Sequence, residues 1–130
     1  MPGIVHFEIP ADDQDRAKQF YRSAFDWVVE PIPGMDDYTA VRTTPADEET
    51  GQPLEPGAIN GAIFRREGQL TNPVLTVDVE DVDRALERVV EAGGTVVAPR
   101  AAVPGMGWFA YFADPEGNVL GLWTTDEGAA

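Results

Sequence analysis

The stretch Asp114–Trp123, DPEGNVLGLW, combines a tight turn with the start of a strand. Asp-Pro followed by Gly-Asn indicates a turn, because proline fixes φ, glycine supplies positive φ and asparagine tolerates a strained backbone. The segment 119–124 is apolar, aromatic and β-branched, which predicts a strand. A similar segment, 57–64, lies 60 residues upstream, and its glycines 57 and 61 match glycines 117 and 121. The match indicates an internal repeat.

The repeat extends over most of the chain. Superposing residues 4–31 on 72–99 gives eight identities, whereas chance gives about two at average residue usage. Each copy begins with a strand that leads into an amphipathic helix, capped by Asp12 or Asp13 in the first copy and by Asp81 in the second. Further strands are predicted at 27–32, 38–43, 58–65, 95–98, 108–113 and 119–124. The pattern predicts an α+β fold of two βαβββ modules, at about 3–65 and 72–125, in a single domain covering 1–130.

Periodicity within these elements predicts their packing. The first strand, 4–9, alternates so that Phe7 and Ile9 share one face and His6 and Glu8 the other, and Pro10 is expected to end it. A stripe on the first helix is expected to pack on its sheet, formed by Ala17, Phe20, Tyr21, Ala24 and Phe25. The two modules are expected to enclose a cleft between them.

Composition limits the classes of partner. The 130 residues carry 23 Asp and Glu against nine Lys and Arg, a formal net charge of −14, so a nucleic-acid partner is disfavoured. The acids are spread along the chain, which fits either an ordinary solvated surface or adaptation to high salt, a halophilic character. Cysteine is absent, so disulfides and thiolate sites are excluded. Without a signal-peptide pattern or membrane-spanning run, the protein is expected to be cytoplasmic and to have no membrane partner.

Three motifs resemble those of the vicinal oxygen chelate (VOC) superfamily, which includes glyoxalase I, bleomycin-resistance proteins and extradiol dioxygenases. They are HFEIPADD with AKQFYRSAFDW, then VDVEDVDRALERVVEAGG, and finally DPEGN. The resemblance implies the paired βαβββ fold and a homodimer. It also implies four metal-ligand positions, which fall on His6, Gly61, Val74 and Gly121. Only His6 can donate to a metal, and Glu8 adds at most one oxygen, so we expect no metal cofactor.

The candidate site residues follow from these positions. His6 and Glu8 are candidate catalytic groups, although His6 also fits an ordinary strand histidine, and Glu8 fits either a wet cleft or a pair with Arg42. Candidate ligand-binding aromatics, which equally fit a core or a dimer interface, are Tyr38, Trp108, Tyr111 and Trp123.

Three functions remain open at this point. The leading hypothesis is a glyoxalase or bleomycin-resistance type of protein that binds a small organic molecule without a catalytic metal. The second is a metal-dependent lyase or isomerase, similar to lactoylglutathione lyase, or a dioxygenase-related enzyme, in which an ion held by His6, Glu8 and water stabilises an enediolate. The third is an accessory domain that binds another protein.

Overall fold

The computed structural model describes residues 1–130, which form eight strands and two helices. In chain order these are β1 (Ile4–Ala11), α1 (Gln14–Phe25), β2 (Val28–Pro31), β3 (Tyr38–Arg42), β4 (Gly61–Arg65), β5 (Val74–Asp78), α2 (Val82–Glu91), β6 (Thr95–Val103), β7 (Gly107–Ala113) and β8 (Val119–Thr125). The predicted α+β class is confirmed. Neither helix has the length and hydrophobicity that crossing a bilayer requires.

The chain divides into two compact units. The first unit is His6–Pro73, and the second unit is Val74–Ala130 together with Met1–Val5, so that β1 begins in one unit and ends in the other. The strands hydrogen-bond in the order β2-β3-β4-β1-β5-β8-β7-β6. Each unit therefore contributes four strands and one helix, which is the repeat that the sequence predicts.

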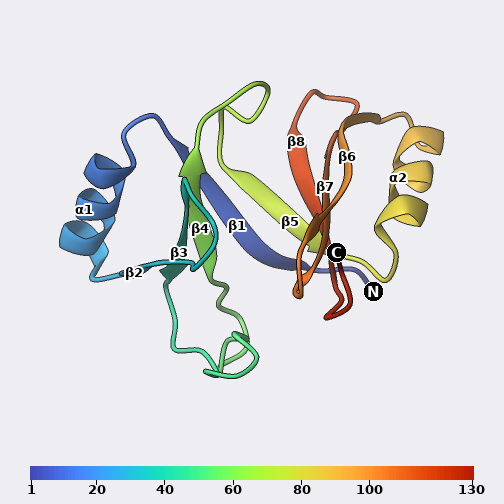
Figure 1. Ribbon diagram of the computed structural model, residues 1–130. Helices are drawn as coiled ribbons and strands as arrows, with labels where there is room; N and C mark the ends of the chain where they lie inside the picture. The colour runs from blue at the N-terminus through green and yellow to red at the C-terminus, as the bar shows by residue number, and fades with distance from the viewer. The chain divides into compact units, whose positions relative to one another are not determined.

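In the first unit, β1 runs parallel to β4, whereas β2, β3 and β4 are antiparallel neighbours. Helix α1 covers one face of these strands (Figure 1). Val29, Val41 and Ile63 form the buried centre under the helix, and Phe7 and Tyr21 pack against them. Because side chains alternate along a strand, this cluster fixes which face each strand residue occupies.

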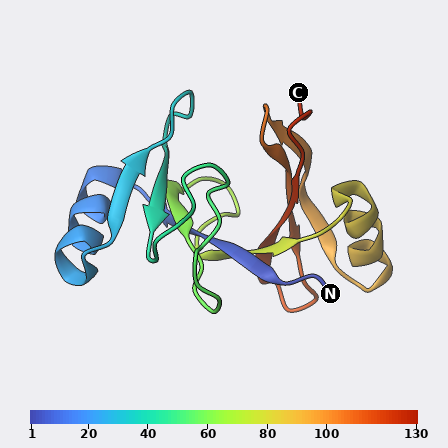
Figure 2. The same ribbon diagram turned by 90° about the horizontal axis from the view of Figure 1, so that it is seen from below.

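The second unit repeats this plan with a more aliphatic core. Here β5 runs parallel to β8, and β6, β7 and β8 are antiparallel. Helix α2 covers one face of these strands in both ribbon views (Figures 1 and 2). Val82 and Leu86 from the helix pack with Ala110 and Leu122 from the sheet, and all four are buried.

The predicted turn and cap residues carry out their expected roles. Asp13 caps α1 and Asp81 caps α2, each accepting a hydrogen bond from a backbone N–H three residues on. In the DPEGN turn, Asp114 accepts hydrogen bonds from the backbone and side-chain N–H groups of Asn118, which lower the pKa of its carboxyl. Gly117 adopts a φ of 84° there, which favours glycine.

Two strands run further than predicted, and both pass through a proline. Strand β1 continues through Pro10 to Ala11, and β6 continues through Pro99 to Val103. Strand β6 lies at the end of the strand order, and its register shifts between Val96 and Ala98 and again between Ala98 and Ala101, the interval that contains Pro99. A proline lacks the N–H of a ladder hydrogen bond, so edge strands and bulges are the places that tolerate it. The prediction that Pro10 ends the first strand is wrong, and so is the predicted end of the later strand at residue 98, directly before Pro99.

The predicted stripe on α1 is only partly buried. Ala17 and Tyr21 pack on the core, but Phe20 and Phe25 are 57% and 58% exposed. No residue of α1 is fully buried, whereas α2 buries two. For Phe20, Ala24 and Phe25 the expected packing on the sheet is therefore wrong, because Ala17 and Tyr21 alone make the contact of α1 with the core and these three residues are exposed.

Candidate functional site

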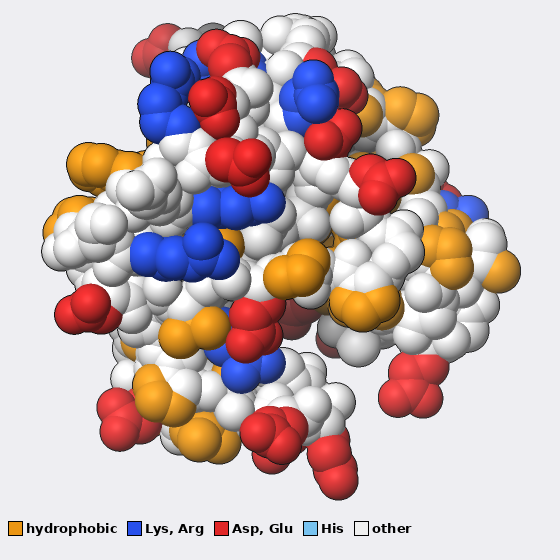
Figure 3. Space-filling view, turned by 60° about the vertical axis from the view of Figure 1, so that its left-hand side comes forward, with side chains coloured by type: hydrophobic (Ala, Val, Ile, Leu, Met, Phe, Trp, Pro, Cys, Tyr) orange, Lys and Arg blue, Asp and Glu red, His pale blue; other side chains and the backbone are white.

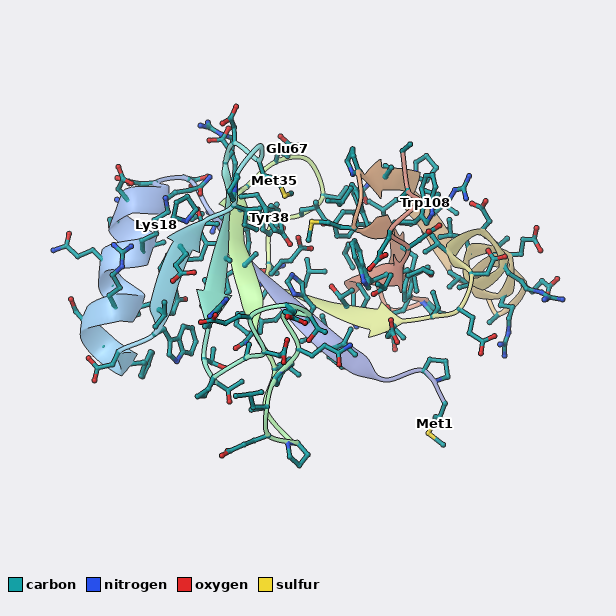
Figure 4. The ribbon with its side chains drawn as sticks, turned by 60° about the horizontal axis from the view of Figure 1, so that its bottom comes forward. Met1, Lys18, Met35, Tyr38, Glu67 and Trp108 are labelled. Atoms are coloured by element: carbon teal, nitrogen blue, oxygen red, sulfur yellow. The ribbon has the colours of Figure 1, made fainter.

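The strands β1–β4 and β5–β8 belong to one eight-stranded sheet, and we call these two sets of strands the first and the second sheet. Each has a helix-free face, which we define as the face opposite its own helix. On the first sheet, Phe7 and Ile9 pack on the helix side, so alternation places His6 and Glu8 on the helix-free face, as predicted. The register aligns Glu8 with Ala62 on β4. These residues share their face with alternate residues of β3, beginning with Tyr38, which lies at one end of the sheet (Figure 4).

His6 and Tyr38 meet on this face. The Nε2 atom of His6 lies 3.0 Å from the hydroxyl oxygen of Tyr38, at hydrogen-bonding distance. Tyr38 on β3 is aligned with Phe64 on β4, and Phe64 is aligned with Pro10 on β1. The Tyr38 backbone therefore lies level with Pro10, four positions along β1 from His6. The residues that lie between Tyr38 and His6 on this face are Ala40 and Ala62. Because these side chains are single methyl groups, the phenol can extend along the sheet to the imidazole.

Burial keeps this histidine neutral. It lowers the pKa of His6 from 6.5 to about 4, so the imidazole is uncharged at pH 7. A base with a pKa near 4 accepts a proton poorly at neutral pH, because general base catalysis is most effective when the pKa lies near the working pH. Glu8 is also buried, with 5% of its surface exposed. The pair His6–Tyr38 is therefore suited to directed hydrogen bonding with a neutral imidazole.

The helix-free face of the second sheet is aromatic. Phe109 on β7 is aligned with Trp123 on β8, and Tyr111 is aligned with Gly121. The rings of Phe109 and Tyr111 meet edge to face with centroids 5.9 Å apart. A Cβ atom added at Gly121 would lie 3.1 Å from Thr76 Oγ1 and 3.5 Å from a ring carbon of Tyr111. The side chains of Thr76 and Tyr111 therefore fill the space beside Gly121.

Trp123 is held in place by its own sheet. A side chain on Gly107 would collide with the Trp123 ring and with the carbonyl oxygen of Thr124, so only glycine permits this packing. The indole Nε1 of Trp123 donates to Thr125 Oγ1 at 3.0 Å. A fixed ring that already has its N–H satisfied offers its apolar face to a partner.

Trp108 lies on the opposite face from the other predicted aromatics of this sheet. It packs beside the α2 core, its Nε1 donates to Asp126 Oδ2 at 3.0 Å, and the Arg100 guanidinium lies 4.2 Å from its ring centroid. The structure therefore brings Tyr111 and Trp123 together with Phe109, which sequence reasoning missed, and separates Trp108 from them. The period-two alternation of β7 was the signal, because Phe109 and Tyr111 share a parity that Trp108 lacks.

The repeated glycines occupy different faces. Gly61 is aligned with Phe7 and faces α1, where an added Cβ would collide with the Phe7 backbone and ring. Gly121 is aligned with Thr76 on the helix-free face. The first-sheet counterpart of Gly121 is therefore Ala62, one residue beyond the position that the sequence repeat assigned.

The register of β4 and β8 decides which residues occupy the four metal-ligand positions that the resemblance implies. The four positions on the helix-free faces are His6, Ala62, Val74 and Gly121, and only histidine offers a donor atom. No three His, Asp or Glu side chains come close enough together to hold one ion. A tightly bound divalent ion needs three or more protein donors, so this residue set does not fit one.

The first unit also contains a hollow of about 570 Å³ beside the start of β3. Met35 and Tyr38 lie at this end of the sheet (Figure 4), and Lys18 and Arg65 contribute the cations of the lining. The remaining lining is mainly carboxylate, from Asp12, Asp13, Asp15, Asp36 and Asp37. Such a lining suits hydrated polar groups and disfavours an apolar ligand.

Comparison with known proteins identifies the family. The model of the Glyoxalase/Bleomycin resistance protein/Dioxygenase superfamily matches residues 3–122. The chain belongs to this superfamily. The protein CFP32 of Mycobacterium bovis, whose name carries the word glyoxylase, is 31% identical over 119 residues, covering 89% of this chain and 43% of its own length. The anthracycline biosynthesis protein DnrV of Streptomyces peucetius is 27% identical over 129 residues, covering 90% of this chain and 45% of its own length.

Solved structures support the superfamily fold. A methylmalonyl-CoA epimerase variant from Streptomyces coelicolor, solved with 2-nitronate-propionyl-CoA, has a TM-score of 0.62 at 16% identity and covers 98% of this chain and 97% of its own. The hypothetical protein BH1468 from Bacillus halodurans has the same TM-score at 12% identity, covering 99% of this chain and 98% of its own. At these identities the likeness establishes the fold alone. The chain spans less than half the length of the first curated relatives that it matches.

Proposed function

We propose that this superfamily member binds a small organic molecule through its helix-free sheet faces, without a catalytic metal. The observation that carries the proposal is the neutral His6 held by Tyr38, in a set of family positions that otherwise offers no metal donor. Ala62, Val74 and Gly121 replace the remaining ligands with small or apolar groups. Such a set supports binding by shape and hydrogen bonding.

The chemistry of the two faces indicates the kind of ligand. Phe109, Tyr111 and Trp123 provide apolar and π surface, and the His6–Tyr38 pair provides a directed polar contact. Ligand sites commonly combine an aromatic lining with a few placed polar groups. We therefore expect the aromatic face to take a planar or largely apolar molecule, and the His6–Tyr38 pair to take a hydrogen-bonding oxygen. Because one relative is named for anthracycline biosynthesis, an anthracycline is a reasoned first probe.

A tryptophan reporter tests ligand binding on the aromatic face. In the double variant Trp27→Phe/Trp108→Phe, Trp123 is the remaining tryptophan. We expect an anthracycline to quench its fluorescence in a saturable way. The matched control is Trp27→Phe/Trp123→Phe, which leaves Trp108 on the α2 face and is expected to respond only by weak, non-saturable collisional quenching. Equal saturable quenching of both reporters, or none at Trp123 across a panel of planar ligands, would contradict the proposal.

The polar contact is tested by Tyr38→Phe. This change removes the hydroxyl that lies 3.0 Å from His6 and keeps the ring. If the ligand bonds to the Tyr38 hydroxyl or to the imidazole that this hydroxyl orients, the loss of one hydrogen bond of about 1.4 kcal/mol weakens binding about tenfold. The Trp123 reporter measures this directly, with Thr50→Val in the 45–57 loop as a control that removes a hydroxyl elsewhere. If Tyr38→Phe binds the ligand with unchanged affinity, the ligand contacts the aromatic face without using the His6–Tyr38 pair.

A metal-dependent lyase or isomerase is the second candidate, because His6 and Glu8 share the helix-free face. Calorimetric titration with nickel, zinc and manganese separates the two candidates. We expect no stoichiometric binding, since two donors hold a divalent ion weakly. Stoichiometric binding that His6→Ala abolishes would favour the second candidate and would be followed by assays for isomerisation through an enediolate.

A further inference from the structure

Asp78 is the residue of β5 that lies beside Trp123. The register of the parallel pair β5 and β8 aligns Asp78 with Trp123 and Val77 with Leu122. Val77 and Leu122 pack towards α2, so alternation places Asp78 and Trp123 together on the helix-free face. Neighbouring strands lie about 4.8 Å apart. Asp78 is therefore the cross-strand neighbour of Trp123 on the aromatic face.

The backbone around Asp78 is held on both sides. Its N–H donates to the carbonyl oxygen of Gly3 at 2.9 Å, and the N–H of Val79 donates to the carbonyl oxygen of Trp123, also at 2.9 Å. All four residues belong to the same compact unit. The position of Asp78 beside Trp123 is therefore fixed within this unit alone.

Asp78 is the one charged residue that the strands place on this face. The other residues that register and alternation bring there are aliphatic, aromatic, glycine or threonine. The cations of this unit lie on the helix side. Arg84 and Arg88 belong to α2, and the Arg100 guanidinium lies 4.2 Å from the ring centroid of Trp108, which packs beside the α2 core. The face therefore attracts a cation and offers nothing that would attract an anion.

The remaining cations of the chain leave Asp78 unpaired. They belong to the first unit, where Lys and Arg side chains are prominent on the side that carries α1 (Figure 3). Asp78 is exposed and forms no ion pair with any of them. Its carboxylate is therefore free to pair with a cation from solution.

Trp123 offers π surface next to this carboxylate. Gly107 supports the indole from the sheet, and the indole N–H already donates to Thr125, so the ring binds a partner through its face. Indole attracts cations more strongly than the other aromatic side chains do. Phe109 is aligned with Trp123 on its other side and extends the apolar area. Carboxylate, indole and phenyl ring thus form one row across three strands.

We propose that the ligand of the aromatic face is a planar organic cation, with its ring system on Trp123 and Phe109 and its ammonium group at Asp78. This inference rests on the proposed ligand binding and adds the charge of the ligand to it. An exposed ion pair alone contributes little, so the rings supply most of the affinity and Asp78 supplies the selectivity for a cation. The alternative is that Asp78 is one more solvated acid in a protein with a net charge of −14.

Three anthracene probes with the same rings and different charges test the proposal. They are 9-(aminomethyl)anthracene, an ammonium ion at neutral pH, the uncharged 9-anthracenemethanol and the anion anthracene-9-carboxylate. Anthracene absorbs where tryptophan emits, so binding quenches the reporter variant Trp27→Phe/Trp108→Phe. We expect the ammonium probe to bind about fivefold more tightly than the alcohol, and the carboxylate more weakly than the alcohol. Equal affinities for the ammonium and the alcohol would overturn this inference and leave ligand binding intact, whereas no saturable quenching by any probe would overturn both.

Variants at Asp78, made in the same reporter, assign the preference to one residue. Asp78→Asn should reduce the preference for the ammonium over the alcohol to about twofold, the part that the indole supplies, and Asp78→Glu should retain it. Glu87→Gln is the matched control, because it makes the same change of charge on α2, on the other side of the sheet. It should leave the preference unchanged. Circular dichroism checks that each variant is folded. A preference that survives Asp78→Asn, or that Glu87→Gln lowers equally, would arise from net charge and would contradict the proposal.

Discussion

The two units share one topology but use their helices differently. Helix α2 buries Val82 and Leu86 against its sheet, whereas α1 buries no residue fully and rests on Tyr21 and the ring of Trp27. Both helices are nevertheless capped by an aspartate at the equivalent position. The same βαβββ unit is therefore formed with two different helix packings, one with buried side chains and one largely exposed.

The helix-free faces differ in the same way. The first sheet presents His6 and Glu8 on β1 and Tyr38 on β3, whereas the second presents Phe109 and Tyr111 on β7 and Trp123 on β8. One copy of the repeat therefore carries the polar groups and the other carries the apolar surface. The aromatic face suits a planar apolar ring system, and the His6–Tyr38 pair suits a hydrogen-bonding oxygen.

The largest expected effect comes from the glycines that the sequence repeat aligns. Gly61→Ala forces a methyl group into the Phe7 backbone, so we expect it to lower the free energy of unfolding by about 3 kcal/mol. Gly121→Ala meets only the Thr76 hydroxyl and the edge of the Tyr111 ring, both of which can shift, and we expect a loss of about 1 kcal/mol. Urea unfolding measures both. Equal losses would indicate that the two glycines are equivalent after all.

The next comparison is between the helices. Leu86→Ala removes a side chain that is 8% exposed in the α2 core, and we expect a loss of about 2.5 kcal/mol in the free energy of unfolding. Phe20→Ala, in the more exposed helix, is expected to cost less than about 1 kcal/mol because the ring is largely in water already. A larger loss for Phe20→Ala would place that ring in the core of the first unit.

Titration of His6 gives the third effect. The pKa of His6 is about 4 in the folded state, whereas in the unfolded state it has its ordinary value of 6.5. Between pH 4 and pH 6.5 the unfolded state therefore binds more protons than the folded state. Stability is therefore complete above pH 6.5 and falls as the pH decreases towards 4. Between pH 7.5 and pH 5 we expect a loss of about 2 kcal/mol in wild type that is absent from His6→Gln, as measured by urea unfolding. Identical pH profiles for the two proteins would show that His6 is not buried as described.

Most of the fold, but less of the candidate site, follows from the sequence. Caps, turns and alternation identified every strand and both helices, and alternation alone placed His6 and Glu8 on one face. The register of β4 did not follow, because matching glycines at 61 and 121 concealed a shift of one residue, and one residue reverses the face of a strand side chain. Trp108 was grouped with Trp123 because the alternation of β7, which places Trp108 on the opposite face, was not applied to it. The contact between His6 and Tyr38 depends on the small residues between them, which no local pattern reveals.

The smallest expected effect is a dependence of stability on salt. At a net charge of −14 the acids repel one another, and the Debye length falls from ~30 Å at 0.01 M salt to ~3 Å at 1 M. Salt also weakens ion pairs, and three pairs lie in the first unit, Lys18–Asp15, Arg65–Asp37 and Arg66–Asp12, against Arg100–Asp83 in the second. These pairs are mostly solvent-exposed, so each contributes little, and relief of repulsion should dominate.

We therefore expect the melting temperature to rise by about 5 °C, or about 1 kcal/mol, between about 0.05 M and about 2 M potassium chloride. Potassium chloride is preferred to sulfate, because a kosmotropic salt strengthens apolar burial and would imitate screening. The variant Glu48→Gln/Glu49→Gln removes two charges from the exposed 45–57 loop and should reduce the rise without changing the core. If repulsion is what salt relieves, the variant melts higher than wild type at low salt and the two converge at high salt. A melting temperature that stays flat over this range in both proteins would leave the acidic surface as a feature of solubility and would remove the case for a halophilic protein.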